Sequence, residues 1–343
     1  MCKGWADVFQ KPHHRQAVIV VGNITDPLTM TEFNFESDLR QELKDLSSSL
    51  GFKIADNKNL DNMLMDYLTV RTKIIEPKRR TVLINPFLKL EIPTHPKKKE
   101  IEFIIQTAAK GGNLNIFQSK RLLQTNFHDH LQNEWNIFHF HLSLKKDKKT
   151  KFVKQVNSLL FAYIDNEQVI FLGIDTHNEG VFADTKWIEV LHDFFPNAIK
   201  QYKDEKITSV YPKVNSTERQ ILWNKGYTLG MTEIKGVVYH NPGIGRTTSG
   251  HSMINSKTSV EILRWIYKLK EQVEESYSLL CKYLNVDEQF AKFKVRFGEK
   301  TLELYEKKSE EILVTFPSVL LDRQELEEKI NTAYNIGIAN SGA

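Results

Sequence analysis

The sequence contains only two cysteines, Cys2 and Cys281, and so few cysteines fit a protein of a reducing compartment. It has no apolar run that approaches the roughly 18 to 20 residues needed to cross a bilayer. Its first residues lack the apolar core and the small-residue cleavage site of a secretory signal. We therefore expect a cytoplasmic protein that does not enter a membrane.

The chain also has little excess charge of either sign, because 47 lysines and arginines face 43 acidic residues in a net charge of +4. The basic residues are concentrated in three runs, at 77–80, at 96–99 and, most densely, at 145–154. Clustered cations steer and hold phosphate groups, whereas the plainer interpretation of such a run is a solvated loop. Acids and bases are interleaved after Lys257, so we expect an anionic partner to meet the middle of the chain.

Composition and apolar patterning predict an α+β protein, with 41% hydrophobic and 26% charged residues. The expected parts are a mixed helical N-terminal part (1–118), a central antiparallel sheet flanked by helices (119–256), and a C-terminal part with a long helix and a small antiparallel sheet (257–343). The C-terminal part is the candidate for a homodimer contact or a protein partner.

Helical spacing and cap residues predict helices over 36–50, 59–70, 97–109, 119–131, 215–223, 257–284 and 322–334, with one more from about 184. Alternating and short apolar runs predict strands over 16–22, 81–86, 136–143, 158–164, 169–174, 236–240, 293–297, 301–305 and 312–316.

The densest strand pattern begins at Trp135. There Ile137, His139 and His141 alternate with phenylalanine and leucine, so a strand buries the phenylalanines on one face and carries both imidazoles on the other. Imidazole titrates near neutrality and can give or accept a proton at a phosphodiester oxygen, while nearby lysines hold the phosphate. This chemistry requires no metal and no cofactor. The acid–base candidates are His139, His141, His177 and His251, and the phosphate-binding candidates in the basic run are Lys145, Lys148 and Lys151.

Two alternatives stay open for the same histidines. In one, His139 and His141 combine with Asp175 and His177 to bind a divalent metal, because a strand H-x-H pair can present two nitrogens to one ion. In the other, the imidazoles are structural and form hydrogen bonds across the sheet or to a packed helix.

A glycine-rich loop spans 241–252. Glycines let backbone N–H groups approach an anion, and Arg246 and the hydroxyl of Ser249 are candidates to hold phosphate oxygens. The loop is not a P-loop, because no Gly-Lys-Ser/Thr ending follows the required spacing. A flexible connector is the alternative.

Three stretches, Trp135–Leu142, Leu159–Ala162 and 248–250, together with His177, resemble a block found in uncharacterised bacterial proteins associated with mobile elements. The resemblance implies a bacterial protein of phage or mobile-element conflict, and it carries no known activity.

The 119–131 segment delivers the cluster His128-Asp129-His130. The spacing of Arg121 and His128 resembles the arginine-x4–6-histidine element of the HEPN ribonucleases. That resemblance implies an arginine that holds the phosphate and a histidine that orients the attacking 2′-hydroxyl.

The sequence therefore predicts a nucleic-acid-directed protein, an endoribonuclease-like phosphodiesterase that acts on RNA in preference to DNA. The alternative is a non-enzymatic component of a larger defence assembly that binds nucleic acid or protein.

Overall fold

The computed structural model describes residues 33–178, 180–247, 250–298 and 301–318. Contacts divide the described chain into two compact units, the first Met65–Lys257 and the second 33–64 with 258–318. Both boundaries fall inside helices, α3 (Leu60–Arg71) and α10 (Met253–Leu284). The α+β class is confirmed, because helices accompany a four-stranded mixed sheet in the first unit and a three-stranded antiparallel sheet in the second.

The four-stranded sheet has the order β1-β4-β3-β2, with β1 at Thr81–Ile84, β2 at Ile137–His141, β3 at Ser158–Ile164 and β4 at Gln168–Thr176. The pairs β2–β3 and β3–β4 are antiparallel, as the sequence predicts.

The edge strand β1 was not expected in this sheet, and it pairs with β4 in parallel. The sheet thus crosses the expected domain boundary at 118/119, because the backbone N–H of Thr81 donates to Glu167 and that of Asn85 to Phe171.

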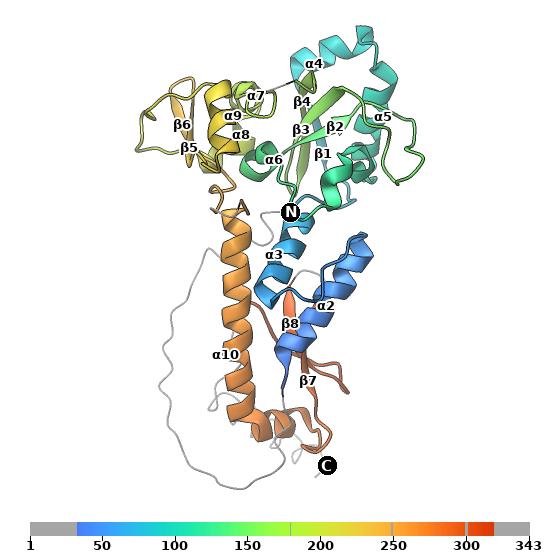
Figure 1. The fold of residues 1–343 in the computed structure, drawn as a ribbon, viewed down its shortest axis with the longest axis vertical. Helices are drawn as coiled ribbons and strands as arrows, with labels where there is room; N and C mark the ends of the chain where they lie inside the picture. Colours follow the sequence, from blue (N-terminus) through green and yellow to red (C-terminus); the bar gives the residue numbers. More distant parts are fainter. Residues whose placement is uncertain (1–32, 179, 248–249, 299–300, 319–343) are drawn as a thin grey trace, which may run out of the picture. The chain divides into compact units, whose positions relative to one another are not determined.

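Both faces of the sheet are covered (Figure 1). One face carries Phe138 and Phe140, which belong to the same core cluster as Ile101 and Ile104 of α5 (Lys98–Ala109). The opposite face carries Phe161, whose ring stacks at 4.2 Å on Trp187 of α7 (Lys186–Phe194). All five residues of β2 are therefore buried. The imidazole face predicted from the alternation exists, but it is enclosed, because α7 and the segments around it pack on that side.

The predicted helix over 119–131 is wrong. In its place are a 3-10 turn (Lys120–Leu123) and, after a break, α6 (His130–Trp135). The break has a local cause, because the side chain of Ser119 accepts from the N–H of Arg121 and that of Asp129 accepts from Gln132, so each residue caps a new start.

The remaining elements of the first unit are α4 (Pro86–Glu91), α8 (Pro196–Ile199), α9 (Ser216–Asn224), β5 (Met231–Ile234), β6 (Val237–His240) and 3-10 turns at Ile92–Thr94, Leu114–Phe117 and Lys200–Tyr202. The predicted strand over 236–240 is confirmed, and it forms a hairpin with β5. Asn215 begins α9 with the capping box that its neighbour Glu218 completes.

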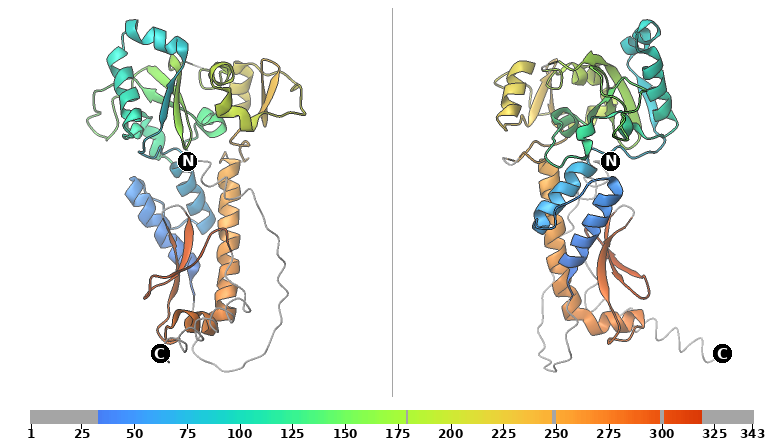
Figure 2. Two further views of the ribbon diagram at one scale, coloured as in Figure 1. Left: turned by 180° about the vertical axis from the view of Figure 1, so that it is seen from behind. Right: turned by 45° about the vertical axis from the view of Figure 1, so that its right-hand side comes forward.

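The second unit contains α2 (Phe35–Leu50) and an antiparallel sheet of β7 (Phe293–Phe297), β8 (Leu302–Glu306) and β9 (Ile312–Thr315). Helix α2 packs against β7 (Figure 2). Gly51 ends α2 in the left-handed conformation at φ 89° that glycine adopts at little cost.

The predicted strand over 16–22 and helix over 322–334 lie outside the described residues. Among the helices that are described, none has both the length and the apolar character to cross a membrane.

Candidate acid–base site

The site centres on His139 in the middle of β2. Its Nδ1 donates to Oδ2 of Asp129 at 3.0 Å, and the two side chains are 9% and 11% exposed. A carboxylate at Nδ1 holds the N–H on that nitrogen and leaves the lone pair at Nε2. Among the described residues, Nε2 of His139 has no hydrogen-bond partner, so this geometry suits a general base.

Asp129 is placed by α6, which it caps by accepting from the backbone N–H of Gln132 at 3.1 Å. Burial acts to raise the pKa of this carboxyl, but the hydrogen bond and charge of His139 and the N–H of Gln132 outweigh it, and the net pKa is lowered. Asp129 is thus an anion at neutral pH, and its hydrogen bond orients the imidazole of His139.

Lys73 is buried beside this pair. Its ammonium donates to the carbonyl oxygens of Gln124 at 2.7 Å and Phe127 at 3.0 Å. Burial lowers its pKa to about 8, against the opposing effect of Asp129. At pH 7 Lys73 therefore remains mostly charged, and it holds the loop that leads to Asp129.

Lys73, Asp129 and His139 line one small pocket with Gln118, Phe127 and Phe138. The pocket has room for about one water molecule. It therefore suits a single attacking water or hydroxyl group, while the rest of a substrate would lie outside it.

The contacts of His141 are those of a structural residue and not of a catalytic one. Its Nδ1 lies 2.8 Å from the carbonyl oxygen of Val156, and its ring centre is 6.0 Å from that of His139. Burial first, and the charges of His139 and His177 next, lower its pKa to about 4. At neutral pH His141 is thus uncharged and packed beside His139.

His177 is exposed just beyond β4, and Phe182 connects it to the site. The Phe182 ring centre lies 5.1 Å from that of His177 and 4.9 Å from that of His139. Three of the four predicted histidines are therefore gathered around one end of the sheet.

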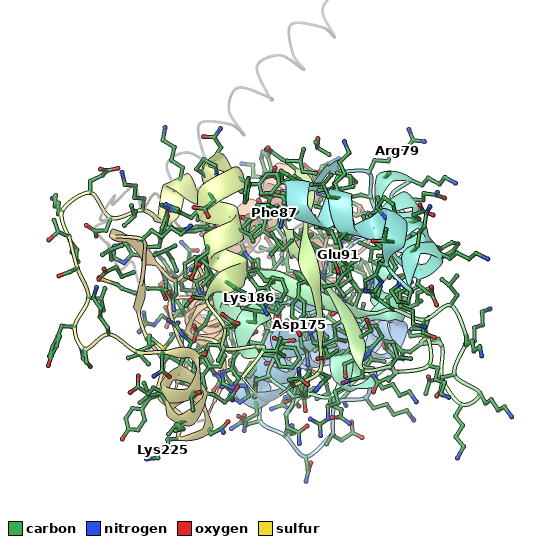
Figure 3. The ribbon with its side chains drawn as sticks, turned by 90° about the horizontal axis from the view of Figure 1, so that it is seen from above. Arg79, Phe87, Glu91, Asp175, Lys186 and Lys225 are labelled. Atoms are coloured by element: carbon green, nitrogen blue, oxygen red, sulfur yellow. The ribbon has the colours of Figure 1, made fainter. Side chains whose placement is uncertain are left out.

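The metal alternative loses its carboxylate, because Asp175 forms an ion pair with Lys186. Both residues are labelled in Figure 3. Within residues 33–318 as far as they are described, no group of three or more histidine, cysteine or acidic side chains is arranged to hold a metal ion.

The predicted phosphate-binding lysines Lys145, Lys148 and Lys151 are all exposed. They lie on a folded hairpin-like loop, in which the N–H of Lys154 donates to Lys145 at 2.7 Å. Asp147 in this loop pairs with Lys120 at 2.5 Å, so it does not neutralise the three candidates.

The glycine-rich loop differs from its prediction. The backbone N–H groups of Thr247 and Gly250 donate at 2.9 Å to His251 and Thr247, and that of Met253 donates to Gly245. These N–H groups are used within the loop, so they do not form the predicted anion cradle. Ser249 lies outside the described residues.

Arg246 and His251 meet different partners from those predicted. Arg246 donates through Nε to the carbonyl of Gly250 at 2.8 Å, and its Nη1 lies 2.9 Å from Nδ1 of His130. The ring of His251 lies 5.4 Å from that of His128. Both belong to a second cluster beside α6, apart from the His139–Asp129 pair.

The sequence pattern places Asp129 in the His128-Asp129-His130 cluster without giving it a role, and it does not point to Lys73. The one available signal was a carboxylate shortly before a strand that carries two histidines. Arg121, the arginine of the HEPN-like spacing, lies over the ring of Phe127, 5.4 Å from its centre.

Comparison of the chain with models of known families, with curated proteins and with solved structures finds no match.

Proposed function

We propose that the protein is a phosphodiesterase that acts on RNA, with His139 as its general base. The observation that carries this proposal is the His139–Asp129 pair, 3.0 Å apart and nearly buried, at a pocket of about the size of a water molecule. An imidazole held by a carboxylate takes protons from hydroxyl groups in many hydrolytic sites.

The proposed reaction uses His139 as the base and the ammonium group of Lys73 as a hydrogen-bond donor. Nε2 of His139 takes the proton of the ribose 2′-hydroxyl, whose oxygen attacks phosphorus, and the 5′-oxygen leaves as the P–O bond breaks. Lys73 has three N–H donors, of which two bind carbonyl oxygens. The third lies in the pocket with His139, where it donates to the attacking oxygen, and the leaving 5′-oxygen outside the pocket takes its proton from solvent water.

The exposed lysines support nucleic acid as the substrate. Lys145, Lys148 and Lys151 follow directly on the strand that bears His139, and clustered cations bind the phosphate backbone through charge. A role in phage or mobile-element conflict belongs to the same proposal, because it rests on the resemblance of the Trp135–Leu142 block.

The direct test is cleavage of labelled single-stranded RNA, duplex RNA and DNA, with and without EDTA. The variants are His139→Ala and Asp129→Asn, and the matched control is His240→Ala, which removes the histidine of an exposed Asp–His pair. We expect EDTA-resistant RNA cleavage that the first two variants lose and the control retains. The proposal would be contradicted if His139→Ala cleaved RNA at the wild-type rate, or if the folded wild type cleaved none of the substrates.

A binding protein without catalysis is the second candidate, and the exposure of the three lysines favours it. In that case RNA binding weakens with salt, persists in His139→Ala, and is lost when Lys145, Lys148 and Lys151 are all replaced by glutamine.

A further inference from the structure

Gln132 of α6 also lines the pocket that contains His139 and Lys73. Its Nε2 donates to the carbonyl oxygen of Thr72 at 3.1 Å. A carbonyl oxygen can only accept, so this bond fixes which way the side-chain amide is turned and leaves Oε1 as its other polar atom. Gln132 is only 3% exposed, and within the described part of the chain its Oε1 is buried without a hydrogen-bond partner.

The unpartnered oxygen of Gln132 indicates a ligand. A buried acceptor that has given up its water and gained no donor costs free energy, and such atoms are rare in folded proteins. Among the buried side-chain atoms that lack a partner in the described residues, Oε1 of Gln132 is the only one that belongs to a residue of this pocket. We therefore expect a group bound in the pocket to donate to it.

The polar atoms of the pocket match one water molecule. Nε2 of His139 and Oε1 of Gln132 each accept a hydrogen bond, whereas the ammonium of Lys73 has one N–H left to donate. A water molecule has two hydrogens and a lone pair for these three places, and the pocket has room for one water. A ribose 2′-hydroxyl has a single hydrogen, which the base takes. It therefore leaves the Gln132 oxygen without a donor, and water satisfies the pocket more completely.

We propose that the protein also hydrolyses 2′,3′-cyclic phosphates, with the attacking water held in the pocket by His139, Gln132 and Lys73. This second activity rests on the proposed function, because attack by a 2′-hydroxyl leaves a 2′,3′-cyclic phosphate at the end of the cleaved RNA. The cyclic ester has no free 2′-hydroxyl, so the nucleophile that opens it is water.

The hydrolysis uses each of the three side chains. Nε2 of His139 takes one proton of the water, whose oxygen forms a bond to phosphorus. Oε1 of Gln132 accepts the other hydrogen and Lys73 donates to one lone pair, so the remaining lone pair is directed at the substrate. The bond between phosphorus and the 2′-oxygen breaks, and this oxygen takes a proton from solvent outside the pocket. The product is a 3′-phosphate monoester, and the imidazolium returns its proton to solvent.

The cleavage and the hydrolysis place the substrate differently. During cleavage the 2′-oxygen is the attacking atom and lies in the pocket. During hydrolysis it is the leaving atom, which an in-line displacement puts on the far side of phosphorus from the attacking oxygen. The cyclic product must therefore leave and bind again the other way round. We expect cyclic ends to accumulate before they are opened, and added cyclic nucleotides to be substrates.

The test uses the full chain with the 2′,3′-cyclic nucleotides of all four bases, and with end-labelled RNA whose new 3′ ends are resolved as cyclic or open phosphates. We expect the wild type to open the cyclic nucleotides, and cleaved RNA to carry cyclic ends first and 3′-phosphates later. Gln132→Met keeps the length of the side chain and removes the acceptor. Its kcat/KM for cyclic nucleotides should fall about tenfold, as for one lost hydrogen bond, while RNA cleavage changes by less than about threefold.

The matched control is Gln168→Met. Gln168 at the start of β4 also donates through Nε2 at 3.1 Å, to Asp165, but it lies outside the pocket. Thermal unfolding of both variants measures the effect of the lost Nε2 bond on the fold. Equal losses of the two reactions in Gln132→Met at an unchanged unfolding temperature, or equal losses of hydrolysis in the two variants, would show that Gln132 does not hold the attacking water.

The wild type decides the activity even where Gln132→Met is unstable. RNA cleavage that leaves only cyclic ends, with no hydrolysis of added cyclic nucleotides, would overturn this proposal and leave the RNA-cleaving function standing. Hydrolysis of cyclic nucleotides without RNA cleavage would do the reverse. Hydrolysis at the wild-type rate by His139→Ala would also overturn the proposal, because the water would then have a different base.

Discussion

Two Asp–His pairs among the described residues of the first unit differ in their burial. In one, His139 and Asp129 lie 3.0 Å apart with side chains 9% and 11% exposed. In the other, His240 and Asp204 lie 2.6 Å apart, and the His240 side chain is 48% exposed. The shorter contact is the one that water screens, so separation alone does not indicate which pair performs chemistry.

The surroundings of the two carboxylates explain the difference. The pKa of Asp204 is lowered mainly by the backbone N–H groups of Ile207 and Lys206, with His240 as a smaller cause. Asp129 is desolvated, and His139 is the main group that keeps it ionised. Because Asp129 is kept ionised mainly by its hydrogen bond to His139, the same bond fixes the orientation of the His139 imidazole. Of the two pairs, this one lies beside Lys73 in a pocket.

The largest expected effect is on catalysis. Asp129→Asn keeps the size of the side chain and its helix cap but removes the charge that orients His139, so RNA cleavage should fall by about 10²- to 10⁴-fold. Asp204→Asn should leave the rate unchanged. Initial rates at saturating RNA measure both, and equal losses would show that the buried pair has no special role.

The next effect is on stability. Asp129→Ala removes a charged hydrogen bond to a nearly buried imidazole together with a helix cap, and we expect a loss of about 2 to 3 kcal/mol in the free energy of unfolding. Urea denaturation measures this loss. A change within about 0.5 kcal/mol would show that the pair contributes no more to the free energy of unfolding than an ordinary surface contact does.

The pH dependence of stability separates the buried histidines around the first pair from Asp204 of the second. The pKa values of His128, His130 and His141 are lowered to about 4, whereas unfolded histidine titrates near 6.5. Between these values the unfolded chain binds more protons, so stability falls as the pH drops from about 6.5 to 4.

The pKa of Asp204 is lowered below 3.8, so its contribution is present above that value and is lost only at lower pH. Thermal unfolding at pH 7, 5 and 3.5 measures the two windows. We expect His141→Gln to flatten the first window and Asp204→Asn to change only the second. An unchanged slope between pH 7 and 5 in His141→Gln would contradict this assignment.

A smaller effect concerns the basic loop. Replacing Lys145, Lys148 and Lys151 by glutamine should reduce the slope of log affinity for single-stranded RNA against log salt by about 0.7 for each phosphate that the lysines no longer neutralise. Fluorescence anisotropy from 50 to 300 mM salt measures the slope. The same slope in the triple variant would show that RNA binds elsewhere.

The smallest expected effect is that of His240→Ala. Its pair is solvent-screened and Asp204 keeps its backbone donors, so neither RNA cleavage nor the unfolding midpoint should change measurably. A drop in either would mean that the exposed pair matters as much as the buried one.

Much of the fold could be predicted from local pattern. The strand around His139, the helix over 36–50 and the three C-terminal strands each appear where expected, because periodicity and caps act over a few residues. The helix over 119–131 failed for a local reason as well, since Ser119 and Asp129 compete with the helix by binding backbone N–H groups.

The sequence by itself determined that His139 and His141 share one face of a strand, that a basic loop follows them, and that the chain is α+β. Only the tertiary structure decided that this face is buried, that Asp129 pairs with His139, that Lys73 lies beside them, and that Arg246 contacts His130 instead. The physical reason is that strand alternation is a property of neighbouring residues. Pairing between side chains, and the desolvation that changes their pKa values, depends on which distant segments pack together.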